Sequence, residues 1–319
     1  MTQQCRLAVS IDDDSIKMAW VAESSRLSSA QLWPITRFST LTDALLAYEK
    51  KAGTPLLGAS CALSVTGATY GDTIMVSRSN WAICRAGLRT MFGRDVIAVN
   101  NVAACAWAAL DGGVAKLEGL SPAAIGEPDF RRGGRWVLTN IDKGVGLAII
   151  DVDDAGIARV LECEMGHCGF APITREDRAL AAALAGVGDG PVSWEMVLTV
   201  SPDDPVWSAP GLPTERAEQA AMIARLAGHY IGDTVLAHGA WSGAILTGNR
   251  VGEMLTEATL PIFNMAYEKV RYRQLVRGAP RWRLTGQNLT LCGCAILLGR
   301  PDARQSYRAS QSWPIASLH

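Results

Sequence analysis

Two asparagines stand where a predicted strand meets a predicted helix. Val96 to Val99 is a short apolar run that predicts a buried strand. Asn100 and Asn101 follow it directly, and small residues predict a helix from Val102 to Leu110. Reactive groups in open α/β sheets gather at such strand ends, but an asparagine there is also a common helix N-cap. Taken alone, the pair favours a cap over a binding site.

A second polar group lies in the segment from Cys163 to Cys168. Glu164 and His167 stand three residues apart, with the two cysteines on either side. Two thiols, a carboxylate and an imidazole could serve as zinc ligands. Such tight spacing without a second group of ligands elsewhere is poor geometry for a tetrahedral site, so no metal is expected. By itself the segment is typical of a surface loop.

Acidic residues fill the turn between the first two predicted strands. Leu7 to Ile11 and Ile16 to Val21 are short β-prone runs that predict a hairpin. Asp12, Asp13 and Asp14 form most of the turn between them. Two interpretations stay open at this point, a solvated hairpin tip and a functional loop.

The second half of the chain repeats this arrangement. Trp136 to Ile141 and Gly146 to Val152 predict another hairpin, broken at Asp142-Lys143-Gly144. Strands alternate with helices in both halves of the sequence. This alternation is typical of an α/β fold.

Length and a change in composition predict two lobes. A chain of 319 residues is longer than one compact core usually holds. The Gly/Pro-rich stretch from Asp111 to Gly134 marks the boundary. We therefore expect a smaller N-terminal α/β lobe of residues 1–112 and a larger C-terminal α/β lobe of residues 113–319. Long helices are predicted in the larger lobe, from Pro213 to His238 and from Val251 to Leu275.

The composition excludes several classes of function. Basic and acidic side chains nearly balance, 30 against 31, and no basic run occurs. We therefore expect neither a nucleic-acid nor a membrane partner. The eight cysteines include no C-x-x-C pair, which fits a reducing compartment, and the first residues do not resemble a signal peptide. The expected location is the cytoplasm.

Four blocks follow one another in the sequence: Trp81 through Ala104, ECEMGHCGFAP at 162–172, SWEMVL at 193–198 and GAWSGAILTGN at 239–249. Together and in this order they resemble the bacterial glucokinase family, whose fold is that of hexokinases and actin-like ATPases. The block from Trp81 through Ala104 is similar to a tryptophan, an amphipathic helix and a strand that ends in I-N-D-F-x-A. ECEMGHCGFAP at 162–172 is similar to P-G-E-G-G-H-x-x-F-A-P. SWEMVL at 193–198 is similar to S-x-E-R-V-L, and GAWSGAILTGN at 239–249 to G-x-x-G-G-V-x-x-G-G. The resemblance implies a two-lobed, ribonuclease H-like fold with duplicated mixed sheets, and a sugar cleft between the lobes.

The resemblance also implies a hexose ligand. Asn100 corresponds to the asparagine before the family's catalytic aspartate. Glu164 and His167 correspond to the E-x-x-H pair, and Glu195 to the glutamate of S-x-E-R-V-L. Hydroxyls of a pyranose both donate and accept, so two carboxylates, an imidazole and an amide can bind several of them in fixed directions. Glucose is the expected hexose.

The family's general base is the aspartate of I-N-D-F, and this position is Asn101 here. A neutral amide cannot take the proton of the sugar hydroxyl at pH 7. Loss of a general base typically lowers a rate by about 10² to 10⁴. The resemblance therefore implies weak phosphoryl transfer, or none.

The family's first phosphate loop, D-x-G-G-T-N, corresponds to residues 10–15, where Asp12, Asp13 and Asp14 replace two glycines and a threonine. Glycine lets the backbone approach the phosphates and donate N–H groups, whereas a carboxylate adds bulk and like charge. At an effective dielectric of about 20, a carboxylate about 4 Å from a phosphate oxygen repels it by roughly 4 kcal/mol. We expect a poor phosphate cradle.

The other nucleotide-facing motifs also differ from the family pattern. The second phosphate loop, G-x-G-T-G-L-G, corresponds to N-I-D-K-G-V-G at 140–146, where Gly144 remains and Lys143 could supply a cation in place of backbone donors. In the adenosine region Gly248 remains, and Asn249 replaces the next glycine. We therefore do not expect the Mg·ATP of the family to bind well here.

Three functions are compatible with these expectations. The first is a cytoplasmic homodimer that binds a hexose and phosphorylates it poorly or not at all, a pseudokinase acting as a sugar sensor or regulator. The second is a working ATP:glucose 6-phosphotransferase in which the triple aspartate holds Mg²⁺ and another carboxylate replaces the base. The third is a scaffold whose fold serves partner binding alone. The first agrees best with retained sugar-facing residues and altered nucleotide-facing ones.

Overall fold

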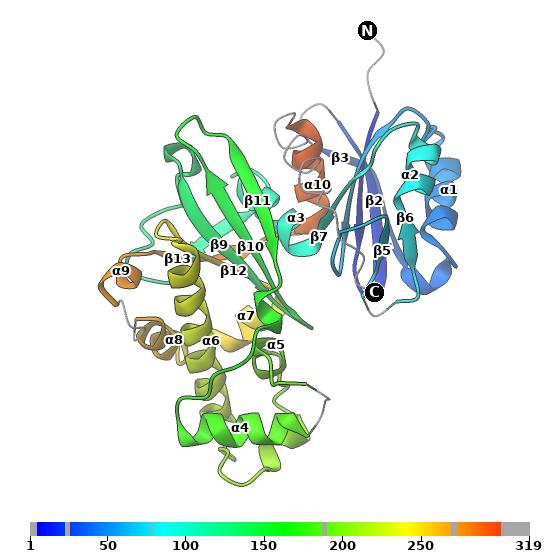
Figure 1. Cartoon of the computed structure of the whole chain (residues 1–319). Coiled ribbons are helices and arrows are strands. Elements are labelled where there is room, and N and C mark those ends of the chain that lie inside the picture. Colours follow the sequence, from blue (N-terminus) through cyan, green and yellow to red (C-terminus); the bar gives the residue numbers. More distant parts are fainter. Residues whose placement is uncertain (1–4, 23–25, 78, 187–189, 269–272, 301–319) are drawn as a thin grey trace. The chain divides into compact units, whose positions relative to one another are not determined.

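The computed structural model describes residues 5–22, 26–77, 79–186, 190–268 and 273–300. The chain divides into two compact units, each built on a mixed sheet with helices (Figure 1). The first unit comprises Met1–Lys116, Ile157–Val160 and Gly286–His319, and the second comprises Leu117–Gly156 and Leu161–Thr285. The α/β class predicted from the sequence is confirmed.

The division of the chain differs from the predicted one near its C-terminal end. The predicted boundary between residues 112 and 113 lies close to Lys116, where the first segment of the first unit ends. Residues 286–300, however, belong to the first unit, although the sequence assigns them to the C-terminal lobe. The reason is a helix in this segment that packs against the first sheet.

A five-stranded sheet forms the centre of the first unit, in the order β3-β2-β1-β4-β7. Its strands are β1 (Arg6–Ile11), β2 (Ser15–Val21), β3 (Leu27–Pro34), β4 (Ser60–Val65) and β7 (Ile97–Asn100). The unit also contains η1 (Ile35–Arg37), α1 (Leu41–Ala52), α2 (Arg85–Phe92), α3 (Asn101–Ala109), α10 (Leu289–Gly299) and a small hairpin of β5 (Thr73–Met75) and β6 (Ala82–Cys84). Because β1 pairs antiparallel with β2, the predicted N-terminal hairpin is confirmed.

Side chains of β1 point alternately to the two faces of this sheet, and each face is covered by different helices. Leu7, Val9 and Ile11 join a hydrophobic core with residues of α1 and α2. Ala8 and Ser10 point to the opposite face, because side chains alternate along a strand. These small residues leave room for α3 and α10, which lie together on that side (Figure 1).

The helix α10 packs very closely on α3. A Cβ atom at Gly293 would lie 1.8 Å from the backbone oxygen of Ala104, so only glycine fits there. The hydroxyls of Ser10 and Thr290 are 2.7 Å apart and join the helix to β1. Because α10 is apolar along nearly its whole length, it shows no helical period, and the sequence pattern does not predict it.

A six-stranded sheet lies mainly in the second unit, in the order β11-β10-β9-β12-β13-β8. Its strands are β8 (Lys116–Gly119), β9 (Gly134–Ile141), β10 (Val145–Val152), β11 (Ala158–Cys163), β12 (Gly243–Thr247) and β13 (Arg281–Thr285). The helices are η2 (Phe130–Arg132), η3 (Met165–His167), α4 (Arg175–Ala185), α5 (Trp194–Leu198), η4 (Pro205–Ser208), α6 (Arg216–His238), α7 (Asn249–Met254), α8 (Leu260–Tyr267) and α9 (Arg273–Arg277). The pairing of β9 with β10 confirms the second predicted hairpin.

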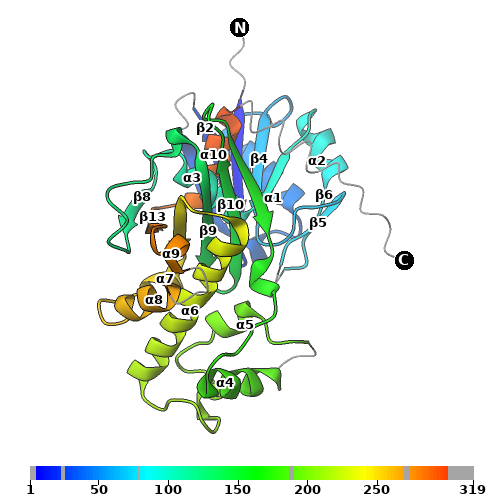
Figure 2. The ribbon, with the colours of Figure 1, turned by 60° about the vertical axis from the view of Figure 1, so that its left-hand side comes forward.

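Buried apolar side chains of the second unit form a core around α6. Ile223 and Tyr230 of this helix are buried together with Val137 of β9. The helix extends from the sheet toward α4 (Figure 2). It ends at Gly239, whose positive φ is typical of a helix C-cap. Within the described ranges, every helix is too short or too polar to span a lipid bilayer.

The single helix predicted from Val251 to Leu275 is wrong, because α7, α8 and α9 take its place. The hydroxyl of Thr259 accepts a hydrogen bond from the backbone N–H of Thr256 at 2.9 Å and donates to the backbone oxygen of Met254 at 2.6 Å. Such side-chain bonds compete with helical ones. Pro261, which lacks an N–H, stands in the first turn of α8, where the N–H groups have no helical partner.

Candidate functional site

The strand β7 passes directly into the helix α3 at the two asparagines. The side-chain oxygen of Asn100 accepts a hydrogen bond from the backbone N–H of Ala103 at 2.7 Å, so Asn100 caps α3. Asn100 is buried, with 7% of its surface exposed. The cap interpretation is therefore confirmed, and a contact between Asn100 and a sugar stays a prediction.

The side-chain amide of Asn101 is held among three acceptors. Its Nδ2 donates to the backbone oxygen of Ile11 at 3.2 Å, to Oδ1 of Asp12 at 3.1 Å and to Oγ1 of Thr66 at 3.1 Å. The carbonyl and the carboxylate can only accept, so the nitrogen must face them. Asn101 therefore ties the start of α3 to the end of β1 and to the residue after β4.

The amide oxygen of Asn101 is buried and accepts no hydrogen bond from the part of the chain that the structure describes. Such an oxygen can accept a hydrogen bond from a ligand hydroxyl. It cannot take the hydroxyl proton, because an amide is not a base at neutral pH. Asn101 therefore cannot act as a general base, and its contact with a sugar hydroxyl stays a prediction.

The acidic turn between β1 and β2 is only partly solvated. Asp12 and Asp13 are half-buried, whereas Asp14 is exposed. Oδ2 of Asp12 lies 3.0 Å from Nζ of Lys17 in β2. Asp12 therefore has a cation on one oxygen and the amide of Asn101 on the other. The interpretation as a solvated hairpin tip fits Asp14 but not Asp12.

A thiol beside this network stays protonated. Burial, and to a smaller extent the negative charge of Asp12, raises the pKa of Cys105 in α3 to about 12, while Lys17 acts in the opposite direction. The thiolate is the reactive form of cysteine. Cys105 is therefore an inert side chain at neutral pH.

The E-x-x-H residues of the second unit lie in a short 3₁₀ turn. The strand β11 ends at Cys163, and η3 then carries His167. Oε2 of Glu164 and Nε2 of His167 are 3.7 Å apart, an ion-pair distance when the imidazole is protonated. About half of each side chain is exposed. Both groups can therefore contact a ligand that comes from solvent.

Glu195 is placed beside this turn by hydrogen bonds between two segments. The backbone N–H of Phe170 donates to the oxygen of Val192 at 2.7 Å. The backbone N–H of Trp194 donates to the oxygen of Cys168 at 3.1 Å. The helix α5 begins at this point and has Glu195 in its first turn. The structure thus brings Glu195 into the same substructure as the E-x-x-H turn.

The predicted second phosphate loop forms the tight turn between β9 and β10. The backbone N–H of Asp142 donates to the oxygen of Gly144 at 3.0 Å. Nδ2 of Asn249 donates to Oδ2 of Asp142 at 3.3 Å, and Lys143 is exposed. A Cβ atom at Gly144 would lie 2.9 Å from Oε2 of Glu195. The resemblance assigns Gly144 to the nucleotide, but in the structure it lies against a predicted sugar residue.

Gly248 stands where β12 meets α7. Its φ is 106°, and a Cβ atom would lie 2.2 Å from the backbone oxygen of Ile141. Only glycine fits both conditions. This close packing on the end of β9 accounts for the glycine, and a contact between Gly248 and adenosine stays a prediction.

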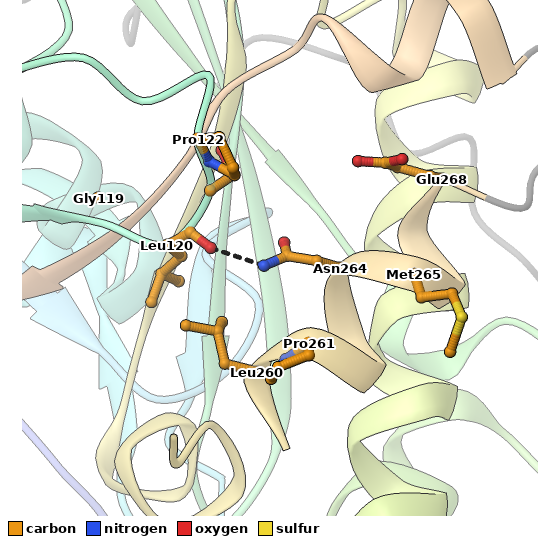
Figure 3. A pocket seen from close by; sticks show the side chains of 9 residues that line it. Gly119, Leu120, Pro122, Leu260, Pro261, Asn264, Met265 and Glu268 are labelled. Carbon is orange, nitrogen blue, oxygen red and sulfur yellow. Dashed lines mark hydrogen bonds between the residues drawn. The ribbon is translucent and has the colours of Figure 1, made fainter. Parts of the chain in front are cut away.

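A separate hollow of about 760 Å³ lies between α8 and the segment after β8 (Figure 3). Asn264 bridges its two sides by donating from Nδ2 to the backbone oxygen of Leu120 at 2.8 Å. Leu260, Pro261 and Met265 contribute to its wall. The described residues that line it include none of the predicted site residues. The hollow therefore gives no support to the sugar or nucleotide assignments.

Lys17, Thr66 and Val145 contact predicted site residues. No motif marks Lys17 or Thr66 in the sequence, and Val145 lies in the predicted second phosphate loop without being singled out there. Lys17 pairs with Ser10 in the hairpin of β1 and β2, and this register could have indicated that Lys17 lies close to Asp12. Thr66 contacts Asn101, which stands 35 residues later in the chain, and Val145 contacts Glu195, which stands 50 residues later. Contacts between such distant segments leave no periodic pattern in one sequence.

A comparison with models of known protein families supports the resemblance predicted from the motifs. The model of the glucokinase family matches residues 15–201, more than half of the chain. The chain belongs to the glucokinase family. Asn100, Asn101, Glu164, His167 and Glu195 all lie within the matched range. The resemblance inferred from the motifs is thus confirmed.

Two curated relatives show how far the likeness extends. The Bifunctional protein glk of Burkholderia pseudomallei is 28% identical over 184 residues, which cover 56% of this chain and 27% of that protein. The chain therefore spans about a quarter of the length of that relative. The Glucokinase of Xylella fastidiosa is 25% identical over 261 residues, which cover 73% of this chain and 76% of the relative.

Solved glucokinase structures share the fold. A glucokinase from an Antarctic psychrotroph has a TM-score of 0.72 and 19% identity, covering 93% of this chain and 99% of its own. A glucokinase from Balamuthia mandrillaris in complex with glucose has a TM-score of 0.73 and 12% identity, covering 94% of both chains. These neighbours confirm the predicted fold of two α/β lobes with duplicated mixed sheets.

The same fold occurs in two further settings. A ROK family glucokinase from Streptomyces griseus, solved with glucose and AMPPNP, has a TM-score of 0.55 and 17% identity, covering 92% of this chain and 98% of its own. A ROK family transcriptional regulator, a homologue of the E. coli MLC protein, has a TM-score of 0.60 and 13% identity, covering 97% and 80%. The fold therefore serves both a kinase and a regulator.

Proposed function

We propose that this glucokinase-family protein binds a hexose, glucose in the first instance, and phosphorylates it weakly or not at all. The observation that carries the proposal is the hydrogen bond between Asn101 and Asp12. These residues stand at the family's base and in its first phosphate loop. Here they bind each other instead of presenting a base to the sugar and backbone donors to a nucleotide.

An aspartate at position 101 would be unfavourable in these surroundings. Its carboxylate would face the carboxylate of Asp12 and the backbone oxygen of Ile11, neither of which can donate. Like charge at this distance disfavours the ionised form that a general base needs. The amide is an uncharged side chain of nearly the same shape that can donate to both groups. The amide at 101 and the carboxylate at 12 therefore support each other.

Mg·ATP fits the residues of the first unit poorly. The family's loop presents backbone N–H groups to phosphate, whereas this turn presents the side chain of Asp12, which is already bonded on both oxygens. Lys17 neutralises one carboxylate, and Asp13 and Asp14 add two more at the same turn. A triphosphate would meet a net negative charge there.

The sugar-facing residues of the second unit favour hexose binding. Glu164, His167 and Glu195 belong to one hydrogen-bonded substructure, and the first two are about half exposed. Carboxylates accept hydrogen bonds from sugar hydroxyls, and an imidazole can donate or accept. The Balamuthia glucokinase, whose structure contains glucose, has the same fold. That Asn100 and Asn101 serve the same hexose is part of the proposal.

A protein of this kind would act as a sugar sensor or as a carbohydrate-dependent regulator. A ligand that is bound and not converted can report its own concentration. The ROK regulator supports this role, because its fold is the same and fold alone does not dictate catalysis. The proposal includes a cytoplasmic location and a homodimer.

Melting temperatures with glucose, with Mg·ATP and with both ligands test the proposal. A ligand that binds only the native state raises stability by about 2.7 kcal/mol at one hundred times its Kd. We expect a rise with millimolar glucose, no further rise with Mg·ATP, and no glucose 6-phosphate in a coupled assay. Glu164→Ala, which removes the acceptor, is the matched variant. It should lose the glucose shift but keep its melting temperature without ligand, because Glu164 is half exposed.

Three results would contradict the proposal. A shift with Mg·ATP and a turnover of about 1 s⁻¹ or more would indicate a working kinase in which the acidic turn holds Mg²⁺. Indifference to both ligands would indicate a scaffold. A full glucose shift in Glu164→Ala would show that the sugar binds elsewhere.

A further inference from the structure

The turn between β9 and β10 fixes the position of a predicted sugar residue. Oε2 of Glu195 accepts a hydrogen bond from the backbone N–H of Val145 at 2.9 Å. A Cβ atom at Gly144 would lie 2.9 Å from the same oxygen. Two features of the turn therefore fix the position of this carboxylate: the N–H of Val145 and the lack of a side chain at Gly144.

The same turn also supports the E-x-x-H segment. A Cβ atom at Gly166 would lie 2.1 Å from the backbone oxygen of Val145, so the two backbones are in direct contact. Gly166 is buried and directly precedes His167 in η3. The N–H of Val145 thus holds Glu195, and its carbonyl is covered by the turn that carries His167.

We propose that Gly144 and Val145 are positioning residues for the hexose and set its affinity with no nucleotide bound. A backbone N–H that bonds one carboxylate oxygen of Glu195 also fixes the direction of the other. The inference rests on the proposed function, because it assigns a cause to hexose affinity. It gives a reason for glycine at 144 in a turn that otherwise departs from a phosphate loop.

A methyl group at position 144 tests this role without substituting a predicted sugar-binding residue. Real Cβ atoms essentially never approach another atom to less than 3.0 Å, so the carboxylate of Glu195 would have to move. The backbone accepts alanine, because the φ of Gly144 lies outside the left-handed region. The variant should therefore keep its fold and displace the carboxylate.

Calorimetric titration with glucose measures the effect. In Gly144→Ala we expect the Kd to rise about tenfold, as for the loss of one hydrogen bond to a charged group. Gly278→Ala is the matched control, because a Cβ atom there meets no atom within 4 Å. Its affinity should equal that of the wild type. An unchanged Kd in Gly144→Ala would overturn the proposal.

Hydrogen exchange at the amide of Val145 gives a second readout that needs no sugar. Glu195→Ala removes the acceptor and should speed exchange several-fold. Glu195→Gln keeps an oxygen at the same place and should restore slow exchange, because an amide oxygen also accepts. Equal exchange in all three proteins would show that the bond does not hold the turn, and would overturn the positioning role.

The outcomes separate this inference from the proposed function. If the wild-type protein binds no hexose, the proposed function fails, and the affinity claim fails with it. If the wild type binds glucose and Gly144→Ala binds it equally well, only the positioning role fails. A tenfold loss in Gly144→Ala with slow exchange restored by Glu195→Gln supports both.

Discussion

Two hairpin turns, one in each unit, correspond to phosphate loops of the glucokinase family, and they differ in what they contact. The turn between β1 and β2 carries Asp12, which is bonded to Lys17 and to Asn101. The turn between β9 and β10 carries Gly144, which lies against Glu195. The first turn is occupied by its own side chains, and the second supports a predicted sugar residue. Under the proposed function, the two turns would have lost a nucleotide role in two distinct ways.

The neighbours of each turn explain the difference. The first turn lies beside the N-terminus of α3, where Asn101 supplies an amide donor that a carboxylate can use. The second lies beside the first turn of α5, where Glu195 supplies a carboxylate that needs a backbone donor. In the turn between β1 and β2, the side chain of Asp12 accepts the hydrogen bond of Asn101. In the turn between β9 and β10, position 144 must lack a side chain, because one would meet the carboxylate of Glu195.

The largest effect is expected when both members of the pair Asn101 and Asp12 are changed to the residues of the family. In Asn101→Asp combined with Asp12→Gly, the carboxylate at 101 has room and the backbone at position 12 is open to a phosphate. Glucose 6-phosphate formation in a coupled assay with Mg·ATP should rise by about 10² over the wild type. Asn101→Asp alone should gain little, because its carboxylate would face that of Asp12.

The control for this experiment pairs Asn101→Asp with Asp14→Gly, since Asp14 is exposed. It should behave like Asn101→Asp alone. An equal gain from the single substitution would show that Asp12 does not hinder a base at 101. The two turns would then no longer differ in the way described.

An acid transition should mark the second unit. Burial alone would raise the pKa of Asp177, but hydrogen bonds from Arg225 and from the backbone N–H of Thr174 outweigh it and lower the pKa to about 2. An unfolded aspartate has a pKa of about 3.9, so the ionised group stabilises the fold above about pH 4, and this stabilisation is lost as the pH falls through about 2. The loss should be about 2 kcal/mol.

Urea unfolding of the wild type and Asp177→Asn between pH 7 and pH 2 measures this contribution. The variant should be less stable by about 2 kcal/mol at pH 7 and should show a flatter acid dependence. Because α4 packs on α5, which carries Glu195, this comparison also tests how far the sugar-side substructure depends on the helices behind it. Identical pH profiles would exclude such a contribution.

The smallest effect should distinguish two aspartates within the first turn. Asp12→Ala removes the acceptor of Lys17 and one of the three acceptors of Asn101, and should lower the free energy of unfolding by about 1 to 2 kcal/mol. Asp14→Ala, at an exposed position, should change it by less than about 0.5 kcal/mol. Equal values from urea unfolding would show that the internal bonds of this turn contribute nothing.

Much of the site could be predicted from short motifs. The E-x-x-H and S-x-E motifs lead to Glu164, His167 and Glu195, which the structure places in one substructure. The strand that ends at Asn100 leads to the cap of α3. Each of these signals is local, because the residues and the element that positions them are neighbours in the sequence.

The contacts of the candidate site between distant segments of the chain could not be predicted in this way. Asn101 meets Thr66 because β4 and β7 pair in parallel, and the register of a parallel pair is not visible in a single sequence. The contact between Gly144 and Glu195 joins segments 50 residues apart. The break between α7 and α8 depends on side-chain bonds of Thr259, which no apolar period reveals.

The close packing of α10 on β1 and α3 has a consequence for how the protein is made. Ser10 can contact Thr290 only after another 280 residues have been synthesised, and Ala104 likewise contacts Gly293 only once α10 exists. While the chain leaves the ribosome, the part of this sheet face that α10 covers stays uncovered until all of the second unit has been synthesised. The unit that begins first is therefore completed last.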